Sequence, residues 1–251
     1  MPPAESPTST GARPGGWAAA GAAGEPAPAV ELRDLSRAYG ERVALAGVTL
    51  TLPRGATLAV FGANGAGKTT LLRILATLLS PHAGTARVLG CELPRDGWAV
   101  RGRVGLLAHE PLLYRELSGR ENLRFHARLH GVGAARVEAL LEAVGMTRRA
   151  DEPLRTLSRG MAQRIAICRA VLHSPELLLL DEPLANLDPG AAGAVEPLIG
   201  AGSGAARVLI SHDVEHGLEE ADVVLGLRGG RQALLARAGE VDAAALRELY
   251  A

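Results

Sequence analysis

The sequence predicts an α/β fold in which helices cover a sheet of short, buried parallel strands. Three apolar stretches support this prediction, at residues 58–61, 177–180 and 208–210, and polar or glycine-rich residues follow each of them. Short uninterrupted runs of this kind are typical of central strands that are covered on both faces. We therefore expect functional residues where these strands end, at one edge of the sheet.

Length and composition indicate one large domain. The chain has 251 residues, 47% of them hydrophobic and 22% charged, with a formal net charge of zero. Residues 1–28 are rich in Pro, Ala, Gly, Ser and Thr, so we expect a disordered tail ahead of a domain that spans 29–251. No block of basic residues is present, which argues against nucleic acid as the main partner.

Neither a targeting segment nor a membrane anchor is expected. The tail lacks the basic start and sustained apolar core of a signal peptide. The longest apolar runs fall well short of the roughly 20 residues that span a bilayer. The two cysteines, Cys91 and Cys168, lie far apart in the sequence, which suits a reducing cytosol and buried thiols.

Local patterns predict two further subdomains. Residues 30–32 and 48–52 alternate as half-exposed antiparallel strands do, and 85–89 reads as another strand. A capping box at 118–121 should open a helix that ends near His130, and a second amphipathic helix should end just before Gly145. We therefore expect an antiparallel β subdomain, and a helical subdomain over roughly 112–165. Residues 104–107 read as a buried strand, 223–225 and 234–235 as edge strands, and 243–249 as a closing helix.

A phosphate-binding loop follows the strand at 58–61. The loop fits the pattern G-x-x-x-x-G-K-[ST] and stands between a short apolar strand and a helix, as Gly62, Ala63, Asn64, Gly65, Ala66, Gly67, Lys68, Thr69 and Thr70. Glycines let successive backbone N–H groups turn towards a phosphate chain, and the helix N-terminus adds positive charge. Lys68 can then reach the β- and γ-phosphates, while the Thr69 hydroxyl can hold Mg²⁺.

The use of basic residues points to the same loop. Lys and Arg together number 27, and Lys68 is the single lysine among them. A compact ammonium group has therefore been kept at the one position where a planar guanidinium would not fit the loop.

Acidic and aromatic residues complete the candidate site. Asp181 and Glu182 end the buried run at 177–180, where a phosphate site needs a metal carboxylate and a base that orients water. His212 follows the run at 208–210. Tyr39 precedes the loop, and the loop alone does not decide whether it stacks on adenine or caps a strand.

In this order, the loop, the stretch Leu157-Ser158-Arg159-Gly160-Met161, the acidic strand end and His212 resemble the ATP-binding subunit of an ABC transporter, from about Val30 to the end of the chain. The resemblance implies that the loop and Tyr39 hold ATP. It further implies that Thr69 and Asp181 hold Mg²⁺, that Glu182 is the general base and that His212 touches the γ-phosphate.

The resemblance also implies partners. Ser158, Arg159, Gly160 and Met161 would reach a γ-phosphate across a head-to-tail dimer, and Asp188 would lie at the same seam. One phosphate loop per chain requires a second ATP-binding subunit, and the expected lack of a membrane span requires a separate transmembrane permease. The chain would then sit peripherally on the cytoplasmic side of the membrane, where ATP binding closes the dimer and hydrolysis reopens it.

Two features depart from the family pattern, the signature and the position after the strand at 104–107. Leu-Ser-Gly-Gly-Gln is the usual signature, and Arg159 and Met161 replace its third and fifth residues. His109 stands where a Gln usually follows the strand at 104–107, and its imidazole can still accept a hydrogen bond from water or approach Mg²⁺. The stretches 104–111 and 120–125, with the Arg-Gly-Met signature, are similar to the ATP-binding subunit of the haem exporter of cytochrome c maturation.

The same motifs are compatible with other functions. An exporter subunit for drugs, lipids or polysaccharide would share every one of these motifs. A soluble ABC ATPase of the ribosome, DNA repair or chromosomes usually carries two cassettes or a coiled-coil insertion, which this chain lacks. The stretch 212–216 fits the zinc pattern H-x-x-E-H, but a strand end is the wrong place for it. His126 and His130 lie four apart on one expected helix, where a packing or solvated face is the simpler interpretation.

Overall fold

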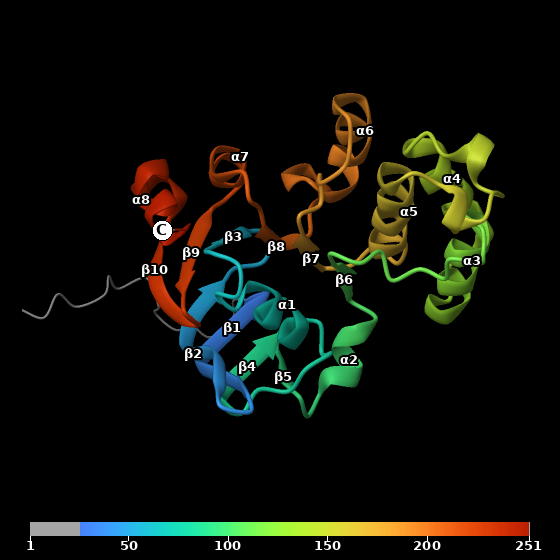
Figure 1. Cartoon of the computed structure of the whole chain (residues 1–251). Helices are drawn as coiled ribbons and strands as arrows, with labels where there is room; N and C mark the ends of the chain where they lie inside the picture. The colour runs from blue at the N-terminus through green and yellow to red at the C-terminus, as the bar shows by residue number, and fades with distance from the viewer. Residues whose placement is uncertain (1–25, 251) are drawn as a thin grey trace, which may run out of the picture.

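A computed structural model of the chain describes residues 26–250 (Figure 1). Most of the tail expected at 1–28 therefore lies outside the described residues. Within them, ten strands form one sheet in the order β5-β4-β1-β2-β10-β9-β3-β8-β7-β6. The predicted α/β fold class is confirmed, with an antiparallel half that leads into a parallel half.

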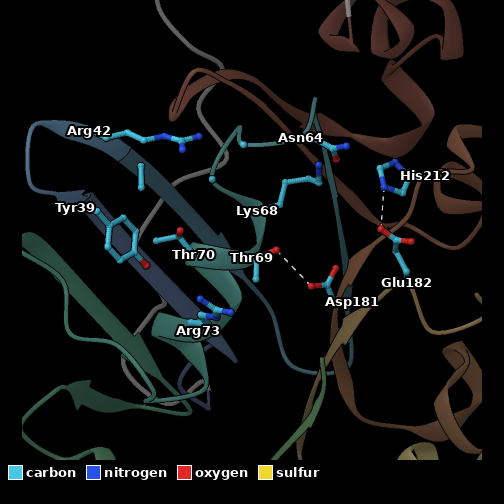
Figure 2. Close-up of a pocket in the computed structure, with 13 residues that line it drawn as sticks. Tyr39, Arg42, Asn64, Lys68, Thr69, Thr70, Arg73, Asp181, Glu182 and His212 are labelled. Atoms are coloured by element: carbon cyan, nitrogen blue, oxygen red, sulfur yellow. Dashed lines mark hydrogen bonds and ion pairs between the residues drawn. The ribbon is translucent and has the colours of Figure 1, made fainter. Parts of the chain in front are cut away.

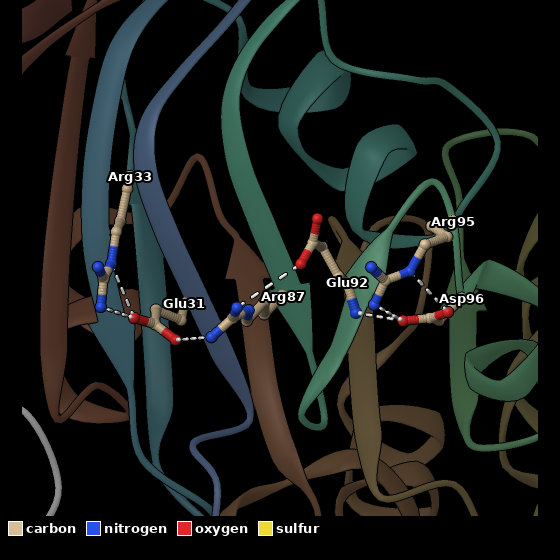
Figure 3. A network of polar contacts seen from close by, with 6 residues as sticks. All are labelled: Glu31, Arg33, Arg87, Glu92, Arg95 and Asp96. Atoms are coloured by element: carbon tan, nitrogen blue, oxygen red, sulfur yellow. Dashed lines mark hydrogen bonds and ion pairs between the residues drawn. The ribbon is translucent and has the colours of Figure 1, made fainter.

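The antiparallel half of the sheet is formed by strands from residues 30–93. It contains β1 (Val30–Tyr39), β2 (Arg42–Leu52), β4 (Ala83–Val88) and β5 (Cys91–Leu93). Exposed ion pairs cross its surface and join Glu31 to Arg33 and Arg87, with Arg87 3.6 Å from Glu92 (Figure 3). Exposed pairs of this kind contribute little stability, so the buried faces of these strands hold this part of the sheet together.

The parallel half carries the strand ends that matter for function. It contains β3 (Thr57–Phe61), β6 (Val104–Leu107), β7 (Leu177–Asp181), β8 (Ala206–Ile210) and β9 (Val223–Arg228). Every residue of β3, β7 and β8 is buried, as the uninterrupted apolar runs predict. β10 (Arg231–Arg237) pairs antiparallel with β9 and meets β2 at Ala46, which joins the two halves of the sheet.

The expectation of edge strands near the C-terminus is wrong. β9 lies between β10 and β3, and residues 223–227 are buried. The edges of the sheet are β5 and β6 instead. The order of strands in a sheet is set by long-range pairing, which a local pattern of apolar residues does not reveal.

Helices cover both faces of the sheet (Figure 1). They are α1 (Lys68–Leu75), α2 (Gly97–Arg101), α3 (Gly119–His130), α4 (Ala134–Ala143), α5 (Arg159–Val171), α6 (Pro189–Ile199), α7 (Val214–Glu219) and α8 (Ala243–Arg247). Short 3₁₀ turns lie at Thr147–Arg149, Leu154–Thr156, Ala201–Ser203, Ala238–Glu240 and Glu248–Tyr250. No helix of the described part is long and apolar enough to cross a bilayer.

The helical block of α3, α4 and α5 forms where the sequence predicts helices. Ser118 caps α3 and forms the expected capping box with Glu121, while Gly145 adopts the left-handed conformation just past α4. The apolar core of this block is continuous with Leu178 and Leu180 of β7. The helices are therefore fixed to one face of the parallel sheet.

Candidate functional site

The loop between β3 and α1 depends on two glycines that no other residue could replace without strain. Gly62 has a φ of +144°, and a Cβ atom there would lie 2.2 Å from the backbone oxygen of Leu227. Gly67 has a φ of +108°, and its Cβ would lie 2.3 Å from the backbone oxygen of Ala44. Only a residue without a side chain fits either position. The loop is thus held tightly against β2 and β9.

Lys68 opens α1 and folds back over the loop. Its side chain is buried, and Nζ donates hydrogen bonds to the carbonyl oxygens of Gly62 at 2.5 Å and Ala63 at 3.1 Å. Burial lowers the pKa of Lys68 below its usual value, and the negative charges of Asp181 and Glu182 oppose that shift. The ammonium group is therefore fixed at the centre of the loop and faces two carboxylates.

Thr69 and Asp181 bring two hard oxygen donors together. The Thr69 hydroxyl lies 3.4 Å from Oδ2 of Asp181, which ends β7 (Figure 2). Burial raises the pKa of Asp181, and the nearby charge of Glu182 raises it further. The charges of His109 and Lys68 act in the opposite direction. This carboxylate therefore gains from a cation placed beside it.

Glu182 and His212 come from the ends of two adjacent strands. Glu182 has a φ of +54°, which is uncommon for a residue with a side chain, and its backbone N–H donates to the carbonyl of Ile210 at 3.0 Å. His212 Nε2 lies 2.8 Å from Oε1 of Glu182 (Figure 2). Strained backbone of this kind is frequent at functional sites, where neighbouring contacts hold it in place.

One cavity of about 340 Å³ brings most of the predicted site residues together (Figure 2). It is lined by Tyr39, Asn64, Gly65, Gly67, Lys68, Thr69, Thr70, Asp181, Glu182 and His212. Gly62, Ala63 and Ala66 belong to the loop but do not line the cavity. Sequence reasoning missed Arg42, Ala44 and Arg73, which also line the cavity. Arg73 lies on α1 one turn beyond Thr69, so helical spacing from the loop was a signal that could have indicated it.

Tyr39 stands at the mouth of the cavity as the last residue of β1. Its side chain is exposed, and the Arg37 guanidinium lies 5.3 Å from the centre of its ring. A cation over the face of an aromatic ring is a favourable arrangement that holds the ring in place. Tyr39 therefore ends a strand and also offers an aromatic surface to the cavity.

The remaining predicted residues do not line the cavity. Ser158, Arg159, Gly160 and Met161 form the start of α5, and Asp188 precedes α6. The Ser158 hydroxyl accepts from the Met161 N–H at 3.2 Å, and Asp188 accepts from Ala191 at 2.9 Å, so both act as helix caps. A Cβ atom on Gly160 would lie 2.5 Å from the backbone oxygen of Asn186. The start of α5 therefore packs directly on the segment that carries Asp188.

His109 and the two histidines of the zinc pattern lie in different surroundings. His109 does not line the cavity, although its charge acts on Asp181. His212 precedes α7 and pairs with Glu182, whereas His216 lies on α7 beside Glu220. No group of three or more His, Cys, Asp or Glu side chains within 26–250 could hold a metal ion by itself.

Comparison with known proteins agrees with this geometry. The family model described as "ABC transporter" matches residues 45–185. The chain belongs to the ABC transporter family. The fold of this ABC chain also matches a solved structure titled "Structure of ATP binding subunit of ABC transporter", with a TM-score of 0.80 and 28% identity over 88% of this chain and 98% of that one. The matched part of the chain is therefore an ABC ATPase domain.

Two curated relatives show how widely this ABC domain is used. The daunorubicin resistance ATP-binding protein DrrA3 of Streptomyces coeruleorubidus is 40% identical over 77% of this chain and 62% of its own length. The phosphonates import ATP-binding protein PhnC of Anaeromyxobacter dehalogenans is 38% identical over 95% of this chain and 52% of its own length. The chain thus spans about half to three fifths of these relatives, and neither is named for haem export.

Proposed function

We propose that the chain binds and hydrolyses ATP as the energy-supplying subunit of a membrane exporter. One observation carries the proposal: the phosphate loop with Lys68, the Asp181 carboxylate and the Glu182–His212 pair converge on a single cavity. Phosphoryl transfer to water needs a cradle for the phosphates, a metal site and a group that orients the attacking water. The chain supplies residues of the right chemistry for each requirement.

The donor set suits Mg²⁺. The Thr69 hydroxyl and the Asp181 carboxylate are hard oxygen ligands at the entrance to the loop, and Mg²⁺ prefers such ligands together with phosphate oxygens and water. Burial has already made the Asp181 charge costly, so a divalent cation would stabilise it. When bound, the ion would neutralise charge on the β- and γ-phosphates.

Glu182 is the proposed general base. Its carboxylate accepts a hydrogen bond from His212 when the imidazole carries its proton on Nε2, and this contact fixes the direction in which the second carboxylate oxygen points. That oxygen would orient a water molecule towards the γ-phosphate and accept its proton. Tyr39 would stack on the adenine from the other end of the cavity.

We also propose that two chains act together. Ser158 and Gly160 stand at the start of α5, away from the cavity of their own chain. The positive N-terminal end of α5 could approach a γ-phosphate only in a second copy that faces this one. A head-to-tail dimer, with Asp188 at its seam, gives the residues of the signature an electrostatic role that they do not have in one chain.

The cargo and the permease are the finer part of the proposal. A drug-like cargo is favoured over haem because the DrrA3 relative is a daunorubicin resistance protein. The PhnC relative is named for import, so an importer is the second candidate. In either case a separate membrane protein would carry the cargo, and the chain would lie on the cytoplasmic face of the membrane.

A trapping experiment tests the proposal. The Glu182→Gln variant is incubated with ATP and Mg²⁺ in solubilised membranes of the source organism, and the proteins that co-purify are identified. Recovery of a permease together with trapped ATP supports an exporter or importer subunit, and the permease itself identifies the cargo class. Recovery of ribosomes or of soluble proteins alone would rule out the transporter role, while trapped ATP would leave the ATPase intact. Glu219→Gln, at an exposed position of α7, is the matched control.

A further inference from the structure

The last helix of the described part returns to the nucleotide site. Helix α8 and the 3₁₀ turn Glu248–Tyr250 follow β10 in sequence and lie beside α7 (Figure 1). Helix α7 begins two residues after His212, and the turn also contacts β9. β9 pairs with β3, the strand that leads into the phosphate loop. The segment 243–250 therefore packs on the elements that border the catalytic end of the cavity.

Polar and apolar contacts fix this segment. Arg247 forms an ion pair with Glu215 of α7, and Arg228 of β9 donates to the carbonyl oxygen of Glu248 at 2.8 Å. The buried side chain of Leu246 belongs to an apolar cluster with Ala59, Phe61, Val214 and Val224. The segment therefore has a defined position relative to β3, β9 and α7.

Gly226 of β9 makes room for the turn. A Cβ atom on this glycine would lie 2.6 Å from Cδ1 of Leu249, so any side chain there would displace the turn. Glycine within a strand often marks such a close approach. Gly226 stands opposite Phe61 in the parallel register of β9 and β3, and Phe61 is the last residue before the phosphate loop. Leu249 therefore lies at the level where β3 ends, and the next residue, Tyr250, reaches the loop.

Tyr250 lies against the site. The centre of its ring is 6.5 Å from the centre of the His212 imidazole, and the two ring planes are inclined by 52°. Its hydroxyl oxygen is buried and lies beside the backbone of Gly62, the first residue of the loop. Burial raises the pKa of Tyr250, the Gly62 backbone opposes this shift, and the negative charge of Glu182 adds to it. One side chain thus lies close to the loop, to the imidazole and to the proposed base.

Tyr250 contacts His212 from outside the cavity, because His212 lines the cavity and Tyr250 does not. The His212 side chain is 49% exposed, and its polar contact among the described residues is the one with Glu182 at 2.8 Å. A single contact leaves an imidazole able to change rotamer. Aromatic rings favour tilted arrangements with their centres roughly 4.5–7 Å apart. The Tyr250 ring therefore gives His212 a second contact, which restricts its rotation.

We propose that Tyr250 is a positioning residue for ATP hydrolysis, whose ring holds the His212 imidazole in the orientation that directs Glu182. This role depends on the proposed function of the chain, because Glu182 acts as a base only if the site hydrolyses ATP. The ring carries the role, since the ring meets the imidazole while the hydroxyl lies beside Gly62. Phenylalanine should therefore replace Tyr250, whereas leucine, which fills space without a ring, should not.

Proton signals of the His212 imidazole test the contact by NMR on the full chain without nucleotide. A neighbouring aromatic ring shifts these signals through its ring current, and His212→Ala identifies them. Tyr250→Leu should change the His212 signals more than those of any other histidine, and Tyr250→Phe should leave them near their original positions. Tyr114→Leu, at an exposed tyrosine outside the cavity, should leave them unchanged. His212 signals that do not respond to Tyr250→Leu would overturn the proposal.

Steady-state phosphate release tests the role in the reaction. Tyr250→Leu should lower kcat about tenfold, because a misplaced group in the site slows the chemical step. KM for ATP should change less than about twofold, because Tyr250 does not line the cavity. Tyr250→Phe should keep the original kcat, and Tyr114→Leu is again the control. A Phe variant as slow as the Leu variant would overturn the role of the ring.

A double variant shows whether Tyr250 acts through His212. In a His212→Ala background, Tyr250→Leu should cost no further activity, because the group that it positions is already missing. A further tenfold loss in that background would overturn the proposal. No phosphate release from the unaltered chain would overturn the proposed function itself, whereas an unaltered rate that Tyr250→Leu retains would overturn only the role of Tyr250.

Discussion

His212 Nε2 lies 2.8 Å from Oε1 of Glu182, although the two residues belong to different strand ends. The pairing of β7 with β8 explains this contact, because Asp181 stands opposite Ile210 in the parallel register. The residues that follow each strand therefore emerge side by side. A one-residue slip of either strand would separate the imidazole from the carboxylate, so the register of the buried sheet determines the geometry of the site.

His212→Ala should slow ATP hydrolysis more than it weakens ATP binding. The imidazole orients Glu182, and its loss would leave the carboxylate free to turn away from the attacking water. We expect kcat to fall by about 10²-fold, within the range for a positioned acid–base group. Steady-state phosphate release and equilibrium ATP binding are measured on the same preparation. His82→Ala, in the antiparallel half, serves as the control, and equal losses of binding and turnover would contradict the orienting role.

Lys68→Ala should remove most of the affinity for ATP. The ammonium group is buried in the loop and donates to two carbonyl oxygens, so the side chain is already ordered. It therefore loses no further conformational entropy when it also contacts the phosphates. Lys68→Arg is the sharper variant, because it keeps the charge and changes only the shape. We expect both to bind ATP at least about tenfold more weakly in a fluorescent-nucleotide titration. ATP binding by Lys68→Arg at the unchanged affinity would show that charge alone is sufficient there.

Tyr39→Ala should weaken binding of ATP while leaving the fold intact. The exposed ring lines the cavity and is held by Arg37, so its loss removes a stacking surface and no core contact. We expect about a tenfold increase in Kd, since a base stacked on an aromatic side chain contributes roughly 1–3 kcal/mol. Tyr39→Trp should bind normally. Comparison with triphosphate alone separates stacking from phosphate contacts: only ATP binding should respond to Tyr39→Ala.

The parts of the fold and site that could be predicted from the sequence depend on local patterns. The strand, loop and helix order around Lys68, the capping box at Ser118 and the apolar run of β7 each follow from neighbouring residues, and the structure confirms them. The sequence does not predict a helix at α6, because the segment contains two glycines and Pro197 lies inside it. The cap at Asp188 with Pro189 at the first position was the available signal.

The residues that the sequence does not place in a cavity come together through long-range packing. Arg42 reaches the nucleotide cavity because the β1–β2 hairpin packs beside the loop, and nothing local distinguishes it from the other arginines of the chain. His126, His130 and His173 line one cavity only because α3 and the end of α5 pack beside the edge of the sheet. Sequence spacing gave His126 and His130 one shared helix face and no indication of His173.

Acid should destabilise the protein before its carboxylates titrate. In the unfolded chain a histidine has a pKa near 6.5, whereas burial lowers the pKa of His126 and His173 to about 4 in the folded state. Between these values the unfolded state binds more protons, so the free energy of unfolding falls as pH falls from about 6.5 to 4. Thermal unfolding in a carboxylate-free buffer measures the slope. His126→Asn should flatten the slope, because it removes one of the two groups with a lowered pKa.

The ion pair between Arg207 and Glu220 should be important for stability only as a pair. Arg207 is 1% exposed, donates to the Thr57 hydroxyl at 3.0 Å and to the Ile199 carbonyl at 3.1 Å, and pairs with Glu220. Glu220→Ala leaves a buried guanidinium without its counter-charge, so we expect a loss of about 3 kcal/mol in the free energy of unfolding. The double variant Arg207→Met with Glu220→Leu removes both charges and should recover most of that loss. Urea unfolding of the two variants decides the matter: a double variant that is less stable than Glu220→Ala would show that the hydrogen bonds of Arg207 stabilise the fold by themselves.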